Sequence, residues 1–246
     1  MPSIMNETTP NAASLTAPVA IVIAGILIAG AVLYSNKGQS AGAVEDGQGI
    51  AQAAGSTSSV RPVNDSDHIQ GNPDALVKIV EYSDFECPFC KRFHETMNQI
   101  MDEYGNSGQV AWVYRHFPLD QLHPKNARIE AVASECVNEL GGNDAFWRFT
   151  DRLFELTPSN DQTDVKTVIP QIVRELGINE QDFNTCMDSG KYDKHIESDI
   201  ANAVETGGQG TPWSIVIAEN GKTFSLSGAQ PYASVKQLIE IALQDK

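Results

Sequence analysis

Cys87-Pro88-Phe89-Cys90 is the stretch of this sequence that decides its fold. Pro88 favours the start of a helix, because its fixed φ suits the first helical turn, where a missing N–H removes no hydrogen bond. Cys87 would then lie at a helix N-terminus, where unpaired N–H groups and the positive end of the helix dipole stabilise a thiolate. A thiolate with a lowered pKa is an effective partner in disulfide exchange. The motif therefore predicts thiol–disulfide chemistry.

The residues around the motif predict a strand before it and a helix after it. Residues 76–82 are apolar and rich in β-branched side chains, as in a strand. Apolar side chains then recur with helical spacing from Phe93 to Tyr104. A cysteine pair at a strand-to-helix junction favours a redox role.

Two other interpretations of the pair stay open. Cys87, Cys90 and His94 could be three ligands of a zinc site, although no second paired motif is present to complete a tetrahedron. The pair could also be a purely structural disulfide. We expect no metal and no cofactor other than the redox-active disulfide.

The five histidines are scattered along the chain. His94 lies one helical turn beyond Cys90 and is expected to face solvent. The others show no metal-ligand spacing, so we expect structural or surface roles for all five. These others are His68, His116, His123 and His195.

Glu81 lies six residues before Cys87, near the end of the predicted strand. A carboxyl group buried beneath Cys90 would have a raised pKa and could accept or return the proton of that thiol. The alternative is an exposed glutamate on an edge strand, since position alone does not establish burial.

A third motif, Gly208-Gln209-Gly210-Thr211-Pro212, precedes the apolar run 213–218. A proline that follows flexible glycines and precedes a strand is a candidate for a cis peptide bond in a tight turn. An ordinary loop proline is the alternative.

Together these motifs resemble the thioredoxin fold and, more specifically, the DsbA-type thiol:disulfide oxidoreductases. The likeness rests on residues 81–90, 114–119 and 210–212 and extends from about residue 67 to the C-terminus. It implies an α/β thioredoxin-like fold that carries a helical insertion.

The resemblance also implies a role for each motif residue. Cys87 would be the exposed nucleophile and Cys90 the buried resolving thiol. Pro212 would be the cis-proline beside the pair, and the backbone of Thr211 would align a substrate peptide. Glu81 would be the buried acid that relays a proton.

Phe89 departs from the best-known oxidant of the family, which has a histidine at this position. A phenylalanine cannot donate a charge-assisted hydrogen bond to the thiolate, so the strongest oxidising power is not expected. Asp84 and Glu86 would also tend to raise the pKa of Cys87. Pro88 and Phe89 are expected to contact the substrate.

The N-terminal region predicts a membrane anchor. Residues 17–34 contain no charged side chain and approach the ~20 residues needed to cross a bilayer. A cleaved signal peptide is the alternative, but no basic residue precedes the run, and the small-residue site at 41–43 lies far beyond it.

The orientation of the anchor is only weakly encoded. The only basic residue near the run, Lys37, lies on its C-terminal side and weakly favours a cytoplasmic location for the domain. We nevertheless expect a single-pass membrane protein whose catalytic domain is extracytoplasmic, in the periplasm or at the cell surface, because an oxidant is useful only outside the reducing cytosol.

Composition and periodicity divide the chain into four parts. Residues 1–16 are polar, residues 17–34 form the anchor, residues 35–66 are predicted to be a flexible linker rich in small residues, and residues 67–246 form one domain of about 180 residues.

The domain is longer than a bare thioredoxin fold because it contains a helical insert at about 123–206. Its predicted helices are 123–136, one capped by Asn143-Asp144, 167–176 with Pro170 in its first turn, 179–186 and 192–206. The chain then closes with two strands, 213–218 and 223–226, joined at Asn220-Gly221, and a helix at 231–244.

Cys136 and Cys186 both fall in the predicted insert. Cysteines left over in an oxidising compartment usually pair, so we expect a structural disulfide that closes a loop of about 50 residues and stabilises the fold by about 4 kcal/mol. Two buried free thiols are the alternative.

The net charge of −15 excludes one class of partner. Nucleic acid is not expected, because the sequence has no basic patch to meet a phosphate backbone. We expect the protein to be a monomer, since no dimerisation segment is evident.

The sequence thus predicts a membrane-tethered thiol–disulfide oxidoreductase that donates the Cys87–Cys90 disulfide to folding extracytoplasmic proteins. A quinone-linked membrane protein would be the reoxidant, by resemblance only. A reductase or isomerase that uses the same cysteines is one alternative, and a non-catalytic peptide-binding module is another.

Overall fold

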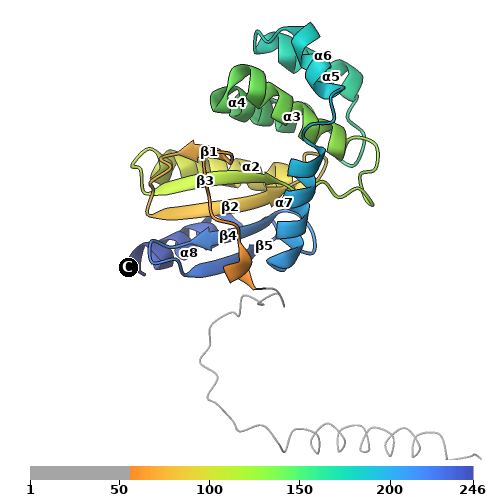
Figure 1. Ribbon diagram of the computed structural model, residues 1–246. Helices are drawn as coiled ribbons and strands as arrows, with labels where there is room; N and C mark the ends of the chain where they lie inside the picture. The colour runs from red at the N-terminus through yellow and green to blue at the C-terminus, as the bar shows by residue number, and fades with distance from the viewer. Residues whose placement is uncertain (1–55, 246) are drawn as a thin grey trace, which may run out of the picture. The chain divides into compact units, whose positions relative to one another are not determined.

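The centre of the molecule is a mixed five-stranded sheet. The computed structural model describes residues 56–245, and all statements below concern that part of the chain. The strands lie in the order β1-β3-β2-β4-β5 (Figure 1). Only β2 and β3 are parallel; the other neighbours are antiparallel. The strands are β1 (His68–Gly71), β2 (Val77–Ser83), β3 (Val110–His116), β4 (Trp213–Ile217) and β5 (Thr223–Ser227).

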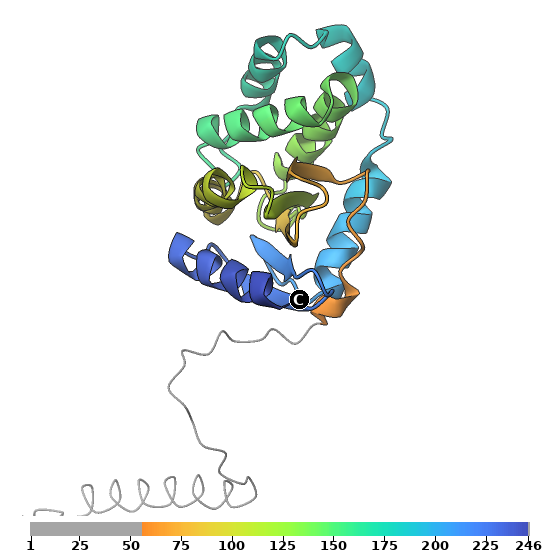
Figure 2. The same ribbon diagram turned by 90° about the vertical axis from the view of Figure 1, so that its left-hand side faces the viewer.

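Helices cover both faces of this sheet. Figure 2 shows α2 and α8 on one side and α7 on the other. The helices are α2 (Pro88–Ile100), α3 (Ala127–Gly141), α4 (Asn143–Leu156), α5 (Val165–Glu175), α6 (Glu180–Met187), α7 (Asp193–Glu205) and α8 (Tyr232–Gln244). One turn of π-helix, Met101–Gly105, continues α2.

The alternation of side chains along β2 explains the two layers. Val77 and Ile79 belong to the core beneath α2 and α8, whereas Val80 and Tyr82 belong to the core beneath α7. Because successive residues of a strand point to opposite faces, Glu81 points to the same face as Ile79, toward α2. The fold thus brings this carboxyl group to the helix that carries the cysteine pair.

The predicted helical insert is confirmed. Helices α3 to α7 lie between β3 and β4 in the chain, and α3 to α6 pack as a group beyond the β1 edge of the sheet (Figure 1). The predicted hairpin also forms, since β4 pairs with β5 across residues 218–222. The fold is therefore the expected thioredoxin-like α/β architecture with a helical insertion.

Two helix starts differ from the sequence prediction. Asn143 does not cap α4; its amide group instead bonds the backbone N–H and C=O of Ile69 in β1. Helix α5 begins at Val165, so Pro170 is its sixth residue rather than part of its first turn. A proline at that place removes one helical hydrogen bond, which the surrounding packing of Ile169 and Ile172 outweighs.

The folded region begins earlier than the predicted boundary at residue 67. A short 3-10 helix, Thr57–Ser59, contacts β5, and the Thr57 and Thr223 hydroxyl oxygens are 2.7 Å apart. Asn202 of α7 donates to the carbonyl of Ser59 and accepts from the N–H of Arg61. Composition does not reveal side-chain hydrogen bonds of this kind. The abundance of small residues therefore predicts a linker over residues 56–66.

The predicted N-terminal segment 1–16, the anchor 17–34 and the remainder of the linker lie outside the described residues. Within residues 56–245, no helix has the length and apolar character needed to cross a membrane.

Candidate active site

The cysteine pair lies where β2 leads into α2. Cys87 has the extended backbone of an N-cap residue, and Pro88 is the first residue of the helix, as predicted. Both cysteines are free thiols in the structure. The structure corrects the expectation that Cys87 is exposed: its exposed fraction is 4%, against 0% for Cys90. The loop before β4 covers it, and the Cys87 Sγ lies 3.4 Å from the carbonyl oxygen of Thr211.

The two thiols have opposite pKa shifts. The pKa of Cys87 falls from 9.0 to about 6, chiefly because the Cys90 thiol donates a hydrogen bond to the Cys87 sulfur. Burial opposes this shift, and the backbone N–H groups of Cys90 and Phe89 reinforce it. Burial raises the pKa of Cys90 well above its ordinary value, and the neighbouring Cys87 adds to the effect. At neutral pH the pair is therefore one thiolate and one thiol.

Glu81 is buried, which excludes an exposed edge position. It lies on the central strand β2, between Tyr114 of β3 and Ser214 of β4. Burial raises its pKa to about 7, although the indole N–H of Trp112 donates to its carboxylate at 2.9 Å and lowers the pKa. A carboxyl group with a pKa near 7 can hold or release a proton at working pH.

The loop between α7 and β4 faces the cysteine pair. The Thr211–Pro212 peptide bond is cis, as the motif predicted. A shallow surface pocket beside this bond is lined by the loop and by the end of β5, including Gln209, Gly210 and Ser227. Phe89 is half-exposed, and the guanidinium of Arg92 lies over its ring. An apolar side chain and open backbone groups thus lie next to the thiolate.

Asp84 and Glu86 are not among the main causes of the Cys87 pKa shift, and each carboxylate is bound by other groups. The Asp84 carboxylate accepts from the backbone N–H groups of Glu86 and Leu119, and it lies 2.8 Å from Nδ1 of His123. Asp84 raises the pKa of His123, which favours an imidazolium that balances the carboxylate charge. This pair could not be predicted from local patterns, because 39 positions separate the two residues.

Glu86 and Glu130 form a buried acidic pair behind the active-site turn. Glu86 accepts from Asn126 and from the N–H of Asp161. Burial, together with the charge of Glu86, raises the pKa of Glu130 to about 9, so Glu130 is protonated at neutral pH. One of the two carboxyl groups is therefore neutral, and the pair places less negative charge near Cys87 than two carboxylates would.

The zinc interpretation of the pair is not supported by the position of His94. This histidine is buried rather than facing solvent, which corrects the expectation, and its Nε2 lies 2.7 Å from Asp151 of α4. Among residues 56–245, the cluster of side chains able to hold a metal is His68, His116 and Glu135, and it does not include Cys87 or Cys90.

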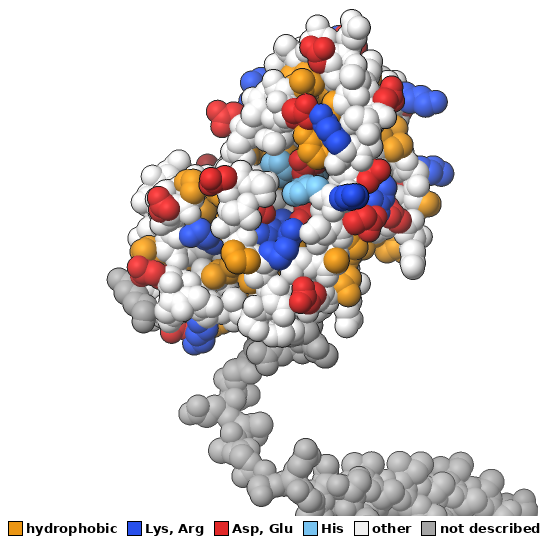
Figure 3. Space-filling model, in the orientation of Figure 1, with side chains coloured by type: hydrophobic (Ala, Val, Ile, Leu, Met, Phe, Trp, Pro, Cys, Tyr) orange, Lys and Arg blue, Asp and Glu red, His pale blue; other side chains and the backbone are white. Residues whose placement is uncertain are grey.

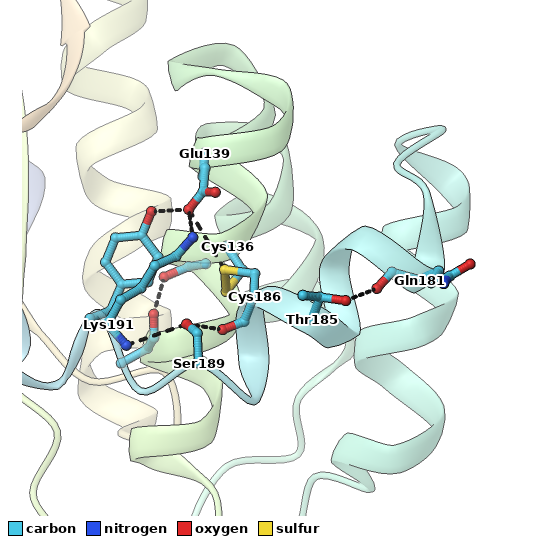
Figure 4. Close-up of a disulfide and its surroundings, with 10 residues drawn as sticks. Cys136, Glu139, Gln181, Thr185, Cys186, Ser189 and Lys191 are labelled. Atoms are coloured by element: carbon cyan, nitrogen blue, oxygen red, sulfur yellow. Dashed lines mark hydrogen bonds and ion pairs between the residues drawn. A yellow bond between two sulfur atoms is a disulfide. The ribbon is translucent and has the colours of Figure 1, made fainter.

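The second cysteine pair is a disulfide, as expected. Cys136 of α3 and Cys186 of α6 are bonded across 50 positions, and both are buried (Figure 4). The Glu139 carboxylate lies beside this bond and accepts from the Tyr192 hydroxyl at 2.7 Å. The bridge ties α6 to α3, which packs against the other helices of the insert.

A thiolate at a helix N-terminus, opposed by a cis-proline loop and a buried acid, defines the molecule as a thioredoxin-like redox protein. The family model described as Thioredoxin matches residues 63–240. The chain therefore belongs to the thioredoxin family.

Similar solved structures show which type of thioredoxin-like protein the chain is. DsbA2 of Pseudomonas aeruginosa is 27% identical with a TM-score of 0.64, and the match covers 75% of this chain and 98% of that one. BdbD of Bacillus subtilis, in its oxidised form, is 26% identical with a TM-score of 0.63, over 72% and 93% of the two chains. The protein is an enzyme, a thiol:disulfide oxidoreductase of the DsbA type.

Curated relatives that are named as antiporters match part of the sequence. The "Na(+)/H(+) antiporter NhaA 1" of Mycolicibacterium gilvum is 41% identical over 96 residues, which are 39% of this chain and 15% of that protein. The corresponding protein of Mycolicibacterium vanbaalenii is 40% identical over 97 residues, again 15% of its length. The chain thus spans a small fraction of these relatives, and their antiport activity is not transferred to it.

Proposed function

We propose that this protein is a disulfide donor: it oxidises pairs of thiols in folding proteins with its Cys87–Cys90 disulfide. The observation that carries this direction is the lowered pKa of Cys87, about 6. A stabilised thiolate lowers the free energy of the reduced protein, so the disulfide form gives up its bond readily.

The transfer proceeds in two exchange steps. A substrate thiolate attacks the Cys87 sulfur, the Cys87–Cys90 bond breaks, and Cys90 leaves as a thiolate. A second substrate thiolate then attacks the substrate sulfur of the mixed disulfide and releases the Cys87 thiolate. Two electrons pass from the substrate to the cysteine pair, and the substrate gains one disulfide.

Glu81 supplies a proton in the first step. Cys90 is completely buried, so its thiolate is costly and takes up a proton as it leaves. The Glu81 carboxyl group lies on the β2 face that α2 covers, and its charge influences the pKa of Cys90. Its own pKa of about 7 allows it to give the proton here and to take it back when the pair is reoxidised.

The substrate lies along the loop before β4. Thr211 and Pro212 line the pocket of this loop, and the Thr211 carbonyl oxygen lies 3.4 Å from the Cys87 Sγ. An extended peptide can align there with the peptide groups of the loop. Phe89 and Leu122, which is 69% exposed, offer apolar contact to an unfolded chain. Contacts of this kind are tolerant of sequence, as a general disulfide donor requires.

The location of this activity is part of the proposal. The uncharged run 17–34 would tether the enzyme to a membrane, with the catalytic domain on the extracytoplasmic side. The Cys136–Cys186 disulfide supports an oxidising compartment. A quinone-linked membrane protein would reoxidise the pair, and the enzyme would act as a monomer.

The reduction potential of the Cys87–Cys90 pair tests the direction. The full chain is equilibrated with glutathione buffers, and the oxidised fraction is read by alkylation and mass spectrometry. A potential of about −120 mV supports a disulfide donor, and one of about −270 mV identifies a reductase and overturns the proposal. The same titration on a chain with Cys136→Ala and Cys186→Ala is the matched control, and its potential should be unchanged.

A further inference from the structure

Three histidines converge on one carboxylate oxygen, far from each other in the sequence. The Oε1 atom of Glu135 lies 2.8 Å from Nε2 of His68, 2.9 Å from Nε2 of His116 and 3.2 Å from Nε2 of His195. The four residues come from β1, the end of β3, α3 and α7. We call them the histidine cluster.

The histidine cluster is crowded for a set of hydrogen bonds. A carboxylate oxygen has two lone pairs, whereas three imidazole nitrogens approach Oε1 of Glu135 within 3.2 Å. His68, His116 and Glu135 are all buried. By residue type, however, three imidazole nitrogens gathered round one carboxylate oxygen are also a donor set for a four-coordinate metal ion.

His68, His116 and Glu135 can hold a small divalent ion after small movements of their side chains. Ligands at about 2.0–2.1 Å from a tetrahedral Zn²⁺ are about 3.4 Å from one another. The nitrogen-to-oxygen distances of 2.8, 2.9 and 3.2 Å therefore need to open by a few tenths of an ångström. The ligand atoms of His68, His116 and Glu135 already lie within 4.8 Å of one another. His195 lies outside that group, 3.2 Å from Oε1 of Glu135, and its ring has to move toward the other two histidines to complete the tetrahedron.

The ion can reach the site from solvent. A surface hollow between β1, α3 and α7 is lined by His68, Glu135 and His195 together with Asp65, Asp67 and Tyr192. Figure 3 shows histidine side chains gathered in this region, at the junction between the helical insert and the sheet. Lys191 also lines the hollow, but its ammonium group is paired with Glu139.

We propose that the histidine cluster is a zinc site, in which His68, His116, His195 and Glu135 bind one Zn²⁺ ion. Neutral imidazoles and a carboxylate suit zinc better than calcium or magnesium, which prefer oxygen ligands. The site is separate from the redox pair and joins two strands of the sheet to two helices of the insert. Its role is structural, because all four positions are taken by protein ligands.

Zinc binding by the oxidised full chain tests the site. The protein is prepared without a polyhistidine tag and with the Cys87–Cys90 bond closed, so that these thiols cannot bind metal. Competition with a chromophoric chelator should give one Zn²⁺ per chain. His195→Gln and Glu135→Gln should each weaken binding by about tenfold or more. His94→Gln is the matched control, a buried histidine paired with a different carboxylate, and should bind as the unaltered chain does.

Cobalt substitution of the unaltered chain gives a second test that needs no variant to fold. Tetrahedral Co²⁺ with nitrogen and oxygen ligands should give intense visible absorption without a sulfur-to-cobalt band. The proposal is overturned if the oxidised chain binds no Co²⁺ or Zn²⁺, if the cobalt spectrum is octahedral or shows thiolate ligands, or if the two ligand variants retain full affinity.

Discussion

The two cysteine pairs of this protein have the same chemistry and opposite environments. Cys87 and Cys90 are three positions apart at the start of α2, free in the structure, with a cis-proline loop and a buried acid around them. Cys136 and Cys186 are 50 positions apart, inside α3 and α6, and are bonded to each other.

The difference shows that position in the fold, not residue type, separates a reactive pair from a structural one. Cys87 receives hydrogen bonds at a helix N-terminus, which stabilise its thiolate and make the reduced state favourable. Cys136 lies in the middle of α3, where the backbone N–H groups are already paired. The carboxylate of Glu139 lies next to Cys186 and would disfavour a thiolate there, so this disulfide is expected to persist.

Cys87→Ser should have the largest effect, because it removes the nucleophile. We expect thiol oxidation of a reduced model protein to fall to the uncatalysed rate, and no mixed disulfide to form. The measurement is the rate of activity recovery of a reduced, unfolded substrate enzyme. Turnover that persists in this variant would mean that the Cys136–Cys186 bond takes part in exchange.

Replacing the structural pair, with Cys136→Ala and Cys186→Ala together, should leave exchange intact and reduce stability. The loop that the bond closes implies a loss of about 4 kcal/mol in the free energy of unfolding. Urea unfolding of both chains, each with the Cys87–Cys90 bond closed, measures it. A variant that lost exchange while remaining folded would contradict the division between the two pairs.

The stability of the reduced protein should depend on pH through Cys87. Folding lowers the pKa of this thiol from 9.0 to about 6, so its stabilising contribution is present at pH 9 and is lost as the pH falls through about 6. The reduced form should therefore gain stability over the oxidised form between pH 6 and 9, by at most about 4 kcal/mol at 1.36 kcal/mol per pKa unit.

Urea unfolding of the two redox forms across this range tests the prediction. Glu81 acts in the opposite sense, because its raised pKa costs stability as the pH rises from 4.5 through about 7. That cost is present in both forms and largely cancels in their difference. A difference that does not change with pH would show that the Cys87 thiolate is not stabilised.

Glu81→Gln should have the smallest effect of the four. The amide oxygen can still accept from Trp112, but the side chain no longer carries a proton between Cys90 and solvent. We expect exchange at pH 7 to slow by about 10²-fold, the lower end for general acid–base catalysis. The pH profile of Cys87 alkylation should retain its midpoint near 6, which separates proton transfer from an altered nucleophile.

Local patterns predicted the redox site well because its residues are close in sequence or carry strong backbone signals. Cys87-Pro88-Phe89-Cys90 specifies its own helix start, and the glycines before Thr211-Pro212 marked the turn. The burial of Glu81 could not be predicted, because it depends on β2 being a central strand.

Pairs of polar residues far apart in the chain were missed for the same reason. The Asp84–His123 pair and the histidine cluster exist only once β1, β3 and the insert are packed together. Strands β1 and β3 themselves were not identified from periodicity: β3 is buried along its whole length and so shows no alternation of polar and apolar residues. A buried strand of this kind can be identified from the strands that pair with it in the structure, but not from its own sequence pattern.

The early start of the folded region has a consequence for how the protein can be shortened. Strand β5 is an outer strand of the sheet, and residues 57–59 lie against it. A chain that begins at residue 67 would remove the contact of Thr57 with Thr223 on β5 and leave Asn202 without its partners Ser59 and Arg61. The eleven residues 56–66 therefore belong to the folded domain, and a shortened chain should keep them.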